Sequence, residues 1–122
     1  MKRLSICWII GCLLGLVACR PEVPAQAEQG ETDVFPDYRE VTVPVNMAPP
    51  NFKLVNQQLQ GITRLKTMNR ELIIAADHGV FNLSETDWKV LSQDAQGKQI
   101  DVTVYFREPQ SDWKQMSFPI YV

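Results

Sequence analysis

The sequence IDVTVYFR, residues 100–107, carries the strongest strand signal in the chain, because apolar and more polar side chains alternate along it. Ile100, Val102, Val104 and Phe106 fall on one face of an extended chain, and the intervening residues fall on the other. A period of two residues is typical of a half-buried β-strand, whereas an amphipathic helix repeats about every 3.6 residues. We therefore expect a strand here, with its apolar face against a core.

Three further β-rich segments predict that this strand has partners. Residues 113–122 follow a turn over residues 108–112 and return as a final strand. Residues 62–68 and 71–76 form the clearest hairpin candidate, with Asn69-Arg70 between them. The second of these two runs contains three consecutive apolar residues, Leu72 to Ile74, which favours a strand covered on both faces.

Two more extended segments precede the hairpin. Residues 41–45 alternate Val with Thr and Pro, and Pro44 would confine such a strand to a sheet edge because it cannot donate a ladder hydrogen bond. Pro49-Pro50 then stiffens the link to a predicted strand over residues 52–55.

A single short helix is predicted from Ser84 to about Asp94. Ser84 can cap the free amide groups, and Asp87 stands three residues later, as in a capping box. Leu83 and Trp88 occupy the two positions of a hydrophobic staple. With about six strands and this helix, the sequence predicts a mainly β fold, a small antiparallel immunoglobulin-like β-sandwich with one short α-helix.

The N-terminus has the features of a secretory signal peptide. Lys2 and Arg3 precede a largely apolar run over residues 4–18, which falls short of the roughly 20 residues of a membrane-spanning helix. The end of this run resembles the bacterial lipobox, whose four positions here are Leu16, Val17, Ala18 and Cys19. The alternatives are an ordinary signal peptide followed by an incidental cysteine, or an uncleaved anchor. We expect a lipoprotein precursor that is cleaved after residue 18.

The lipobox resemblance implies a diacylglycerol on the Cys19 sulfur and an acyl chain on its amine. Two or more acyl chains suffice for stable membrane anchoring. Cys7 and Cys12 would leave with the leader, so thiol catalysis, disulfides and Cys-based zinc sites are excluded from the mature chain. Loss of Lys2 and Arg3 leaves 10 basic and 14 acidic residues, a net charge of −4, which argues against nucleic acid as a partner.

The stretch RPEVPAQAEQGETD, residues 20–33, lacks aromatic residues and aliphatic bulk, which predicts a flexible tether. The expected organisation is a signal peptide over residues 1–18, a lipidated Cys19 and tether over residues 19–34, and one β-sandwich domain over residues 35–122.

We find no catalytic, metal or cofactor motif in the sequence. His78 is the only histidine, and Asp77-His78-Gly79 is typical of a turn between strands. Ser84 is explained by its capping role rather than as a nucleophile.

Three aromatic residues, Tyr105, Trp113 and Tyr121, form the candidate binding surface. If all three face solvent, they would make a platform able to stack on a sugar or hold a protein partner. The alternative is that Trp113 and Tyr121 simply cover the edges of the sandwich.

Residues 36–52, PDYREVTVPVNMAPPNF, resemble a segment of a family of Bacteroidales envelope proteins. In that family a lipoprotein or signal sequence, this stretch and a small β domain precede a TolB-like β-propeller. Pro50 departs from the pattern, where leucine is expected. The resemblance implies an envelope location and assigns no catalytic residue. Because this chain ends where a propeller would begin, it implies either a stand-alone relative or a truncated reading frame.

The sequence after Cys19 lacks the acidic run that resembles a surface-export signal in these bacteria, which favours the periplasmic face of the outer membrane. The leading functional prediction is a non-catalytic, membrane-anchored module that docks another envelope protein, such as a TolB-like propeller. The alternative is a glycan- or peptidoglycan-binding module, and the third hypothesis is a small hydrolase.

Overall fold

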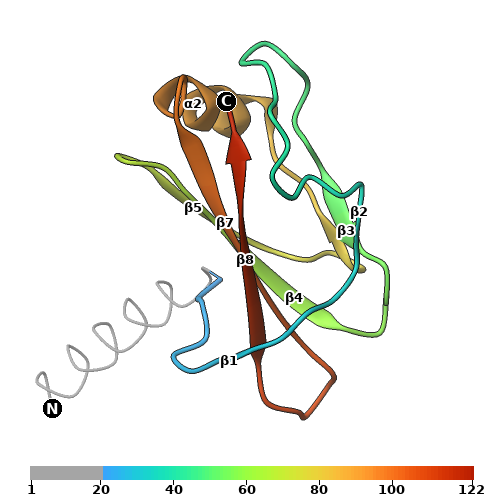
Figure 1. Cartoon of the computed structure of the whole chain (residues 1–122). Helices are drawn as coiled ribbons and strands as arrows, with labels where there is room; N and C mark the ends of the chain where they lie inside the picture. The colour runs from blue at the N-terminus through green and yellow to red at the C-terminus, as the bar shows by residue number, and fades with distance from the viewer. Residues whose placement is uncertain (1–20) are drawn as a thin grey trace, which may run out of the picture.

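The computed structural model describes residues 21–122 as two sheets with one helix, α2, at an end of the sandwich (Figure 1). The larger sheet contains, in spatial order, β1 (Glu28–Gln29), β8 (Lys114–Tyr121), β7 (Gln99–Arg107), β4 (Gln60–Lys66) and β5 (Glu71–Ala75). The smaller sheet contains β2 (Val34–Phe35), β3 (Phe52–Leu54) and β6 (Val80–Phe81), and α2 spans Glu85–Asp94. The predicted fold class, a small mainly β sandwich with one short helix, is confirmed.

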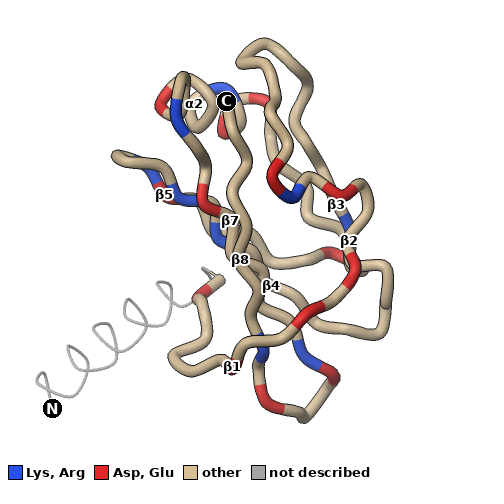
Figure 2. The backbone as a smooth tube through the Cα atoms, in the orientation of Figure 1, with Lys and Arg blue, Asp and Glu red and all other residues tan. Residues whose placement is uncertain are grey.

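The predicted signal peptide and the four predicted lipobox residues, Cys19 included, lie outside the described residues. Within residues 21–122, no helix has the length and apolar character needed to cross a bilayer. Figure 2 shows acidic positions alone along residues 21–38, whereas acidic and basic positions are interspersed along the rest of the described chain.

Strand β7 is the central element of the fold. It pairs antiparallel with β8 on one side and with β4 on the other. Its predicted apolar face is buried, since Ile100, Val102 and Val104 have no exposed surface. Thr103 and Tyr105 on the opposite face are also buried, at 7% and 6% exposure. The strand is therefore covered on both sides, which simple alternation did not predict.

The predicted hairpin and helix are both confirmed. β4 and β5 pair antiparallel through five residue pairs, and the amide of Thr67 donates to the carbonyl of Arg70 across their turn. β5 is an edge strand with a single partner, so its apolar residues 72–74 are only half-buried, and the prediction of cover on both faces is wrong. In α2, the Ser84 side chain accepts a hydrogen bond from the amide of Asp87.

The edge strand predicted over residues 41–45 is wrong. Only Thr42 forms a bridge, parallel to Tyr121, and the chain turns at residues 45–46. The amide of Tyr121 donates to the carbonyl of Val41, and the amide of Val43 donates to the carbonyl of Tyr121 at 2.7 Å. The segment therefore meets the end of β8 briefly and then leaves the sheet.

The flexible tether predicted up to residue 34 is also wrong for its second half. β1 pairs parallel with the start of β8, and the amides of Glu28 and Gly30 donate to the carbonyls of Trp113 and Gln115. Val34 in β2 is 6% exposed and belongs to the core. Backbone pairing to a distant strand orders this polar stretch, although its own side chains bury little surface.

We expect hydrogen exchange to detect this attachment. The amides of Glu28 and Gly30 should exchange at least about tenfold more slowly than the amide of Glu22, because both must break a hydrogen bond first. Exchange measured by NMR on the intact mature protein tests the difference. Equal, unprotected rates at all three amides would show that this stretch is free of the sheet.

Candidate functional site

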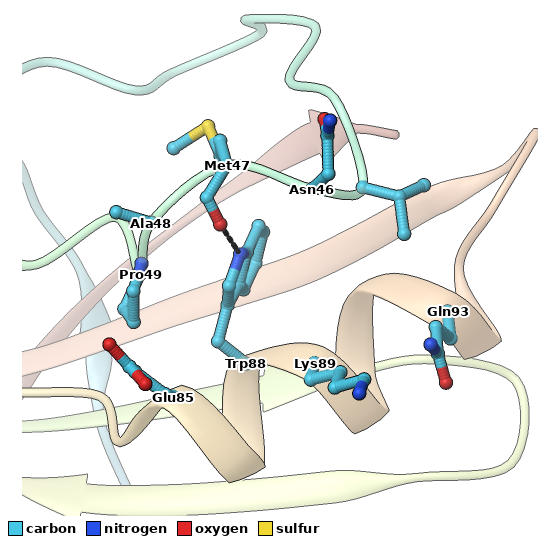
Figure 3. Close-up of a pocket in the computed structure, with 9 residues that line it drawn as sticks. Asn46, Met47, Ala48, Pro49, Glu85, Trp88, Lys89 and Gln93 are labelled. Atoms are coloured by element: carbon cyan, nitrogen blue, oxygen red, sulfur yellow. Dashed lines mark hydrogen bonds between the residues drawn. The ribbon is translucent and has the colours of Figure 1, made fainter.

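The candidate site is a cleft of about 380 Å³ between the loop over residues 45–49 and α2 (Figure 3). We call it the loop–helix cleft. It lies at the end of the sandwich that carries the helix (Figure 1). Its lining residues come from two segments about forty residues apart in sequence: Val45, Asn46, Met47, Ala48, Pro49, Glu85, Trp88, Lys89 and Gln93.

Trp88 joins the two sides of the cleft. Its indole nitrogen donates a hydrogen bond of 3.0 Å to the carbonyl oxygen of Met47, as Figure 3 shows. The side chain is 2% exposed and belongs to the same core as the sheets. A buried indole needs a partner for its N–H, and the loop supplies one. Trp88 therefore fixes the loop relative to the helix.

Prolines and further hydrogen bonds also restrain the loop. Pro44 and the pair Pro49-Pro50 restrict the backbone at both of its ends. Just beyond it, the side-chain oxygen of Asn51 accepts a hydrogen bond of 2.7 Å from the amide of Leu83, ahead of α2. The hydroxyl of Ser92 lies 3.4 Å from the carbonyl oxygen of Val45. The cleft is thus formed in the free protein and does not need a ligand to assemble it.

The two walls of the cleft differ in character. The loop wall is mainly apolar, with Met47 and Pro49 half-buried and Ala48 exposed. The helix wall presents Glu85, Lys89 and Gln93, which are spaced four residues apart and so share one face of α2. Apolar surface bordered by polar and charged groups, as these two walls provide, is the usual composition of a protein–protein contact.

The predicted aromatic platform does not form. The strand register places Tyr105 and Tyr121 on the same face of the large sheet, but Tyr105 is 6% exposed and unavailable to a ligand. Trp113 lies just before β8, outside the paired residues. Trp113 and Tyr121 stand at opposite ends of β8, eight residues or roughly 26 Å apart. The condition that all three residues face solvent is therefore not met, because sequence spacing could not reveal the burial of Tyr105.

Trp113 is half-buried and rigidly placed. The guanidinium carbon of Arg107 lies 4.3 Å from the centre of its ring, a cation–π distance. Arg107 is itself oriented by a hydrogen bond of 2.8 Å from its Nε to the side-chain oxygen of Gln60. Tyr121, by contrast, is 40% exposed at the end of the sandwich near α2.

The turn predicted at Asp77-His78-Gly79 is confirmed. His78 and Gly79 both have positive φ, and Asp77 and Val80 exchange two backbone hydrogen bonds, as in a two-residue hairpin. The His78 side chain is 97% exposed. Among residues 21–122, no three His, Cys, Asp or Glu side chains group closely enough to hold a metal ion.

Two carboxylates away from the cleft have structural partners. The side chain of Arg39 donates two hydrogen bonds to Asp37 and lowers the pKa of that carboxyl to about 2. Asp94, at the end of α2, accepts hydrogen bonds from Thr67 and Asn69 in the β4–β5 turn, and these lower its pKa. Both groups are thereby favoured as ionised acceptors that hold turns together.

No family model matches the chain, and no match is found among curated proteins or among solved structures. The resemblance of residues 36–52 therefore stays a prediction.

Sequence reasoning missed the loop–helix cleft. It identified Trp88 as half of a hydrophobic staple and the Pro49-Pro50 pair as a stiff link, but did not connect them. A buried tryptophan must place its N–H on an acceptor, and this requirement was the available signal that another segment lies across the helix.

Proposed function

We propose that this protein is a non-catalytic envelope lipoprotein, anchored through Cys19, whose β-sandwich docks another envelope protein at the loop–helix cleft. The expected location is the periplasmic face of the outer membrane. The cleft is the main support for this proposal, because its mainly apolar loop wall faces a polar and charged helix wall. The cleft is also already formed in the free protein.

The attachment of residues 27–34 to the sheets keeps the domain close to its proposed anchor. The carbonyl of Ala27 accepts a hydrogen bond from the Gln115 side chain, so only residues 20–26 separate Cys19 from the sheet. Seven residues span at most about 25 Å when fully extended. The cleft would therefore work within roughly one domain diameter of the lipid surface, where another envelope protein is an accessible partner.

The partner's chemistry follows from the two walls. The apolar loop wall suits one large apolar side chain. The helix wall offers Lys89 to an acidic group and Glu85 to a basic group. The loop wall also lies inside residues 36–52, the segment that resembles proteins with a TolB-like propeller. A propeller of that type is accordingly the partner class we favour.

Site-specific photocrosslinking in the producing cells tests the proposal. A photoreactive amino acid in place of Ala48, which lines the cleft, should give a discrete adduct with one envelope protein. The same probe in place of Thr86, an exposed position on α2 outside the cleft, should not. Lys89→Glu should reduce the Ala48-site adduct severalfold without unfolding the domain, since Lys89 is exposed.

The proposal is contradicted if the Ala48 position yields no adduct, or if the Thr86 position yields the same adduct equally well. Mass spectrometry of the adduct identifies the partner. A propeller protein would support the favoured class, and a different envelope protein would replace that class while leaving the docking function in place.

A further inference from the structure

A second hollow, of about 550 Å³, lies where three turns meet, away from α2 (Figure 1). These turns follow β3, β5 and β7, and we call the space between them the three-turn hollow. Its volume falls within the roughly 300–1,000 Å³ of small-molecule sites. Its lining residues are Gln57, Gln58, Leu59, Gln60, Gly61, Ile62, Ala76, His78, Gly79, Pro109 and Trp113.

The lining mixes apolar residues, among them Leu59, Ile62 and Trp113, with amide groups. It contains no carboxylate, ammonium or guanidinium group, and its one titratable side chain is that of His78. Three of its residues are glutamines, whose primary amides donate and accept hydrogen bonds. The side-chain oxygen of Gln60 already accepts one from Arg107, so Gln57 and Gln58 offer the free acceptors. Apart from the imidazole of His78, the lining offers a charged ligand no group of opposite charge. The hollow therefore favours an uncharged ligand that both donates and accepts hydrogen bonds.

Trp113 supplies an apolar ring on one side of the hollow. Arg107, which packs over this ring, lines a different hollow together with Trp113 and residues 26–28, and does not line this one. The indole thus separates the two spaces. Because Arg107 is fixed in turn by Gln60, the aromatic wall is held in place before any ligand arrives.

We propose that the three-turn hollow binds a neutral sugar ring. A pyranose carries hydroxyl groups that donate and accept, which match the glutamine amides, and a face of C–H groups that packs against an aromatic ring. Of the three aromatic residues singled out in the sequence, only Trp113 takes part. The site is separate from the loop–helix cleft and shares no residue with it.

Isothermal titration calorimetry on the mature lipidated protein, in a detergent without a sugar headgroup, tests the site. The probes are the tetrasaccharide of N-acetylglucosamine and the tetrasaccharide of β-1,4-linked glucose, which differ in the acetamido group. We expect saturable binding of at least one of them. Trp113→Ala should weaken it about tenfold or more, as truncation of an aromatic anchor does.

Two matched variants complete the test. Gln58→Ala, at an exposed position that leaves the fold intact, should weaken binding about fivefold through loss of a hydrogen bond. Tyr121→Ala removes an exposed aromatic residue at the far end of β8 and should leave the affinity unchanged. The proposal is overturned if neither sugar binds saturably, if Gln58→Ala retains full affinity, or if Tyr121→Ala costs as much as Trp113→Ala. None of these results bears on docking at the other cleft.

Discussion

Trp88→Ala is expected to lower the free energy of unfolding by about 3–5 kcal/mol, the range for removing a large buried aromatic side chain. The indole is 2% exposed and packs in the core shared by the sheets and α2. Its removal leaves a cavity and also frees the carbonyl of Met47 from its hydrogen bond. A loss of this size would consume much of the 5–15 kcal/mol that typically stabilises a domain.

Urea denaturation followed by far-UV circular dichroism measures this effect. Trp88→Phe should cost about 1 kcal/mol through the lost hydrogen bond, in addition to a smaller packing loss. Lys89→Ala, the exposed neighbour on the same helix, is the control and should change stability by no more than about 0.5 kcal/mol. If Trp88→Ala destabilised the protein no more than this control, Trp88 would not be the link between α2 and the loop.

Cys19→Ala is expected to abolish membrane retention, the largest effect on location. The variant should be exported on a leader cleaved by the general signal peptidase, so that no uncleaved apolar segment can retain it. Without acyl chains the domain should move to the soluble periplasmic extract, since each buried methylene of an acyl chain contributes about 0.8 kcal/mol to membrane binding. The protein with Cys19 and its own leader should stay with the membranes.

Cys12→Ala provides the matched control for this experiment. Cys12 lies in the predicted leader, so its substitution should change neither the incorporation of a labelled fatty acid nor membrane retention. Persistent retention of the Cys19→Ala protein would mean that something other than the lipid holds it at the membrane.

Local signals predicted the elements that depend on local interactions. The alternation over residues 100–107 identified β7, and Ser84 with Leu83 and Trp88 identified the start of α2. In each case the pattern that forms the element also buries its apolar side.

The unexpected contacts of β1 and Thr42 share a physical cause, which is pairing between distant segments. β1 has a polar sequence without a strand pattern, and it is ordered because its backbone pairs with the start of β8, more than eighty residues later. Thr42 similarly meets Tyr121, near the end of β8. Such contacts depend on where the edge of the sheet lies, which one segment's composition does not encode.

The two candidate sites were predictable only in part. The sequence singled out Trp113, but its amide-rich surroundings come from three separate turns. It also identified Trp88, but not that Met47 would accept its hydrogen bond from across the cleft. Single residues such as these two tryptophans can be singled out from sequence. The surfaces that they form depend on the packing of the whole domain.

We propose that this β-sandwich is held at a membrane by a lipid on Cys19, nine residues before β1. Intact-mass measurement of the protein purified from the membranes of producing cells tests it most directly. We predict a mature chain that begins at Cys19, heavier than its sequence by one diacylglycerol group and one acyl chain. A chain that retains residues 1–18, or that carries Cys19 as a free thiol, would show that the protein is not lipid-anchored through Cys19.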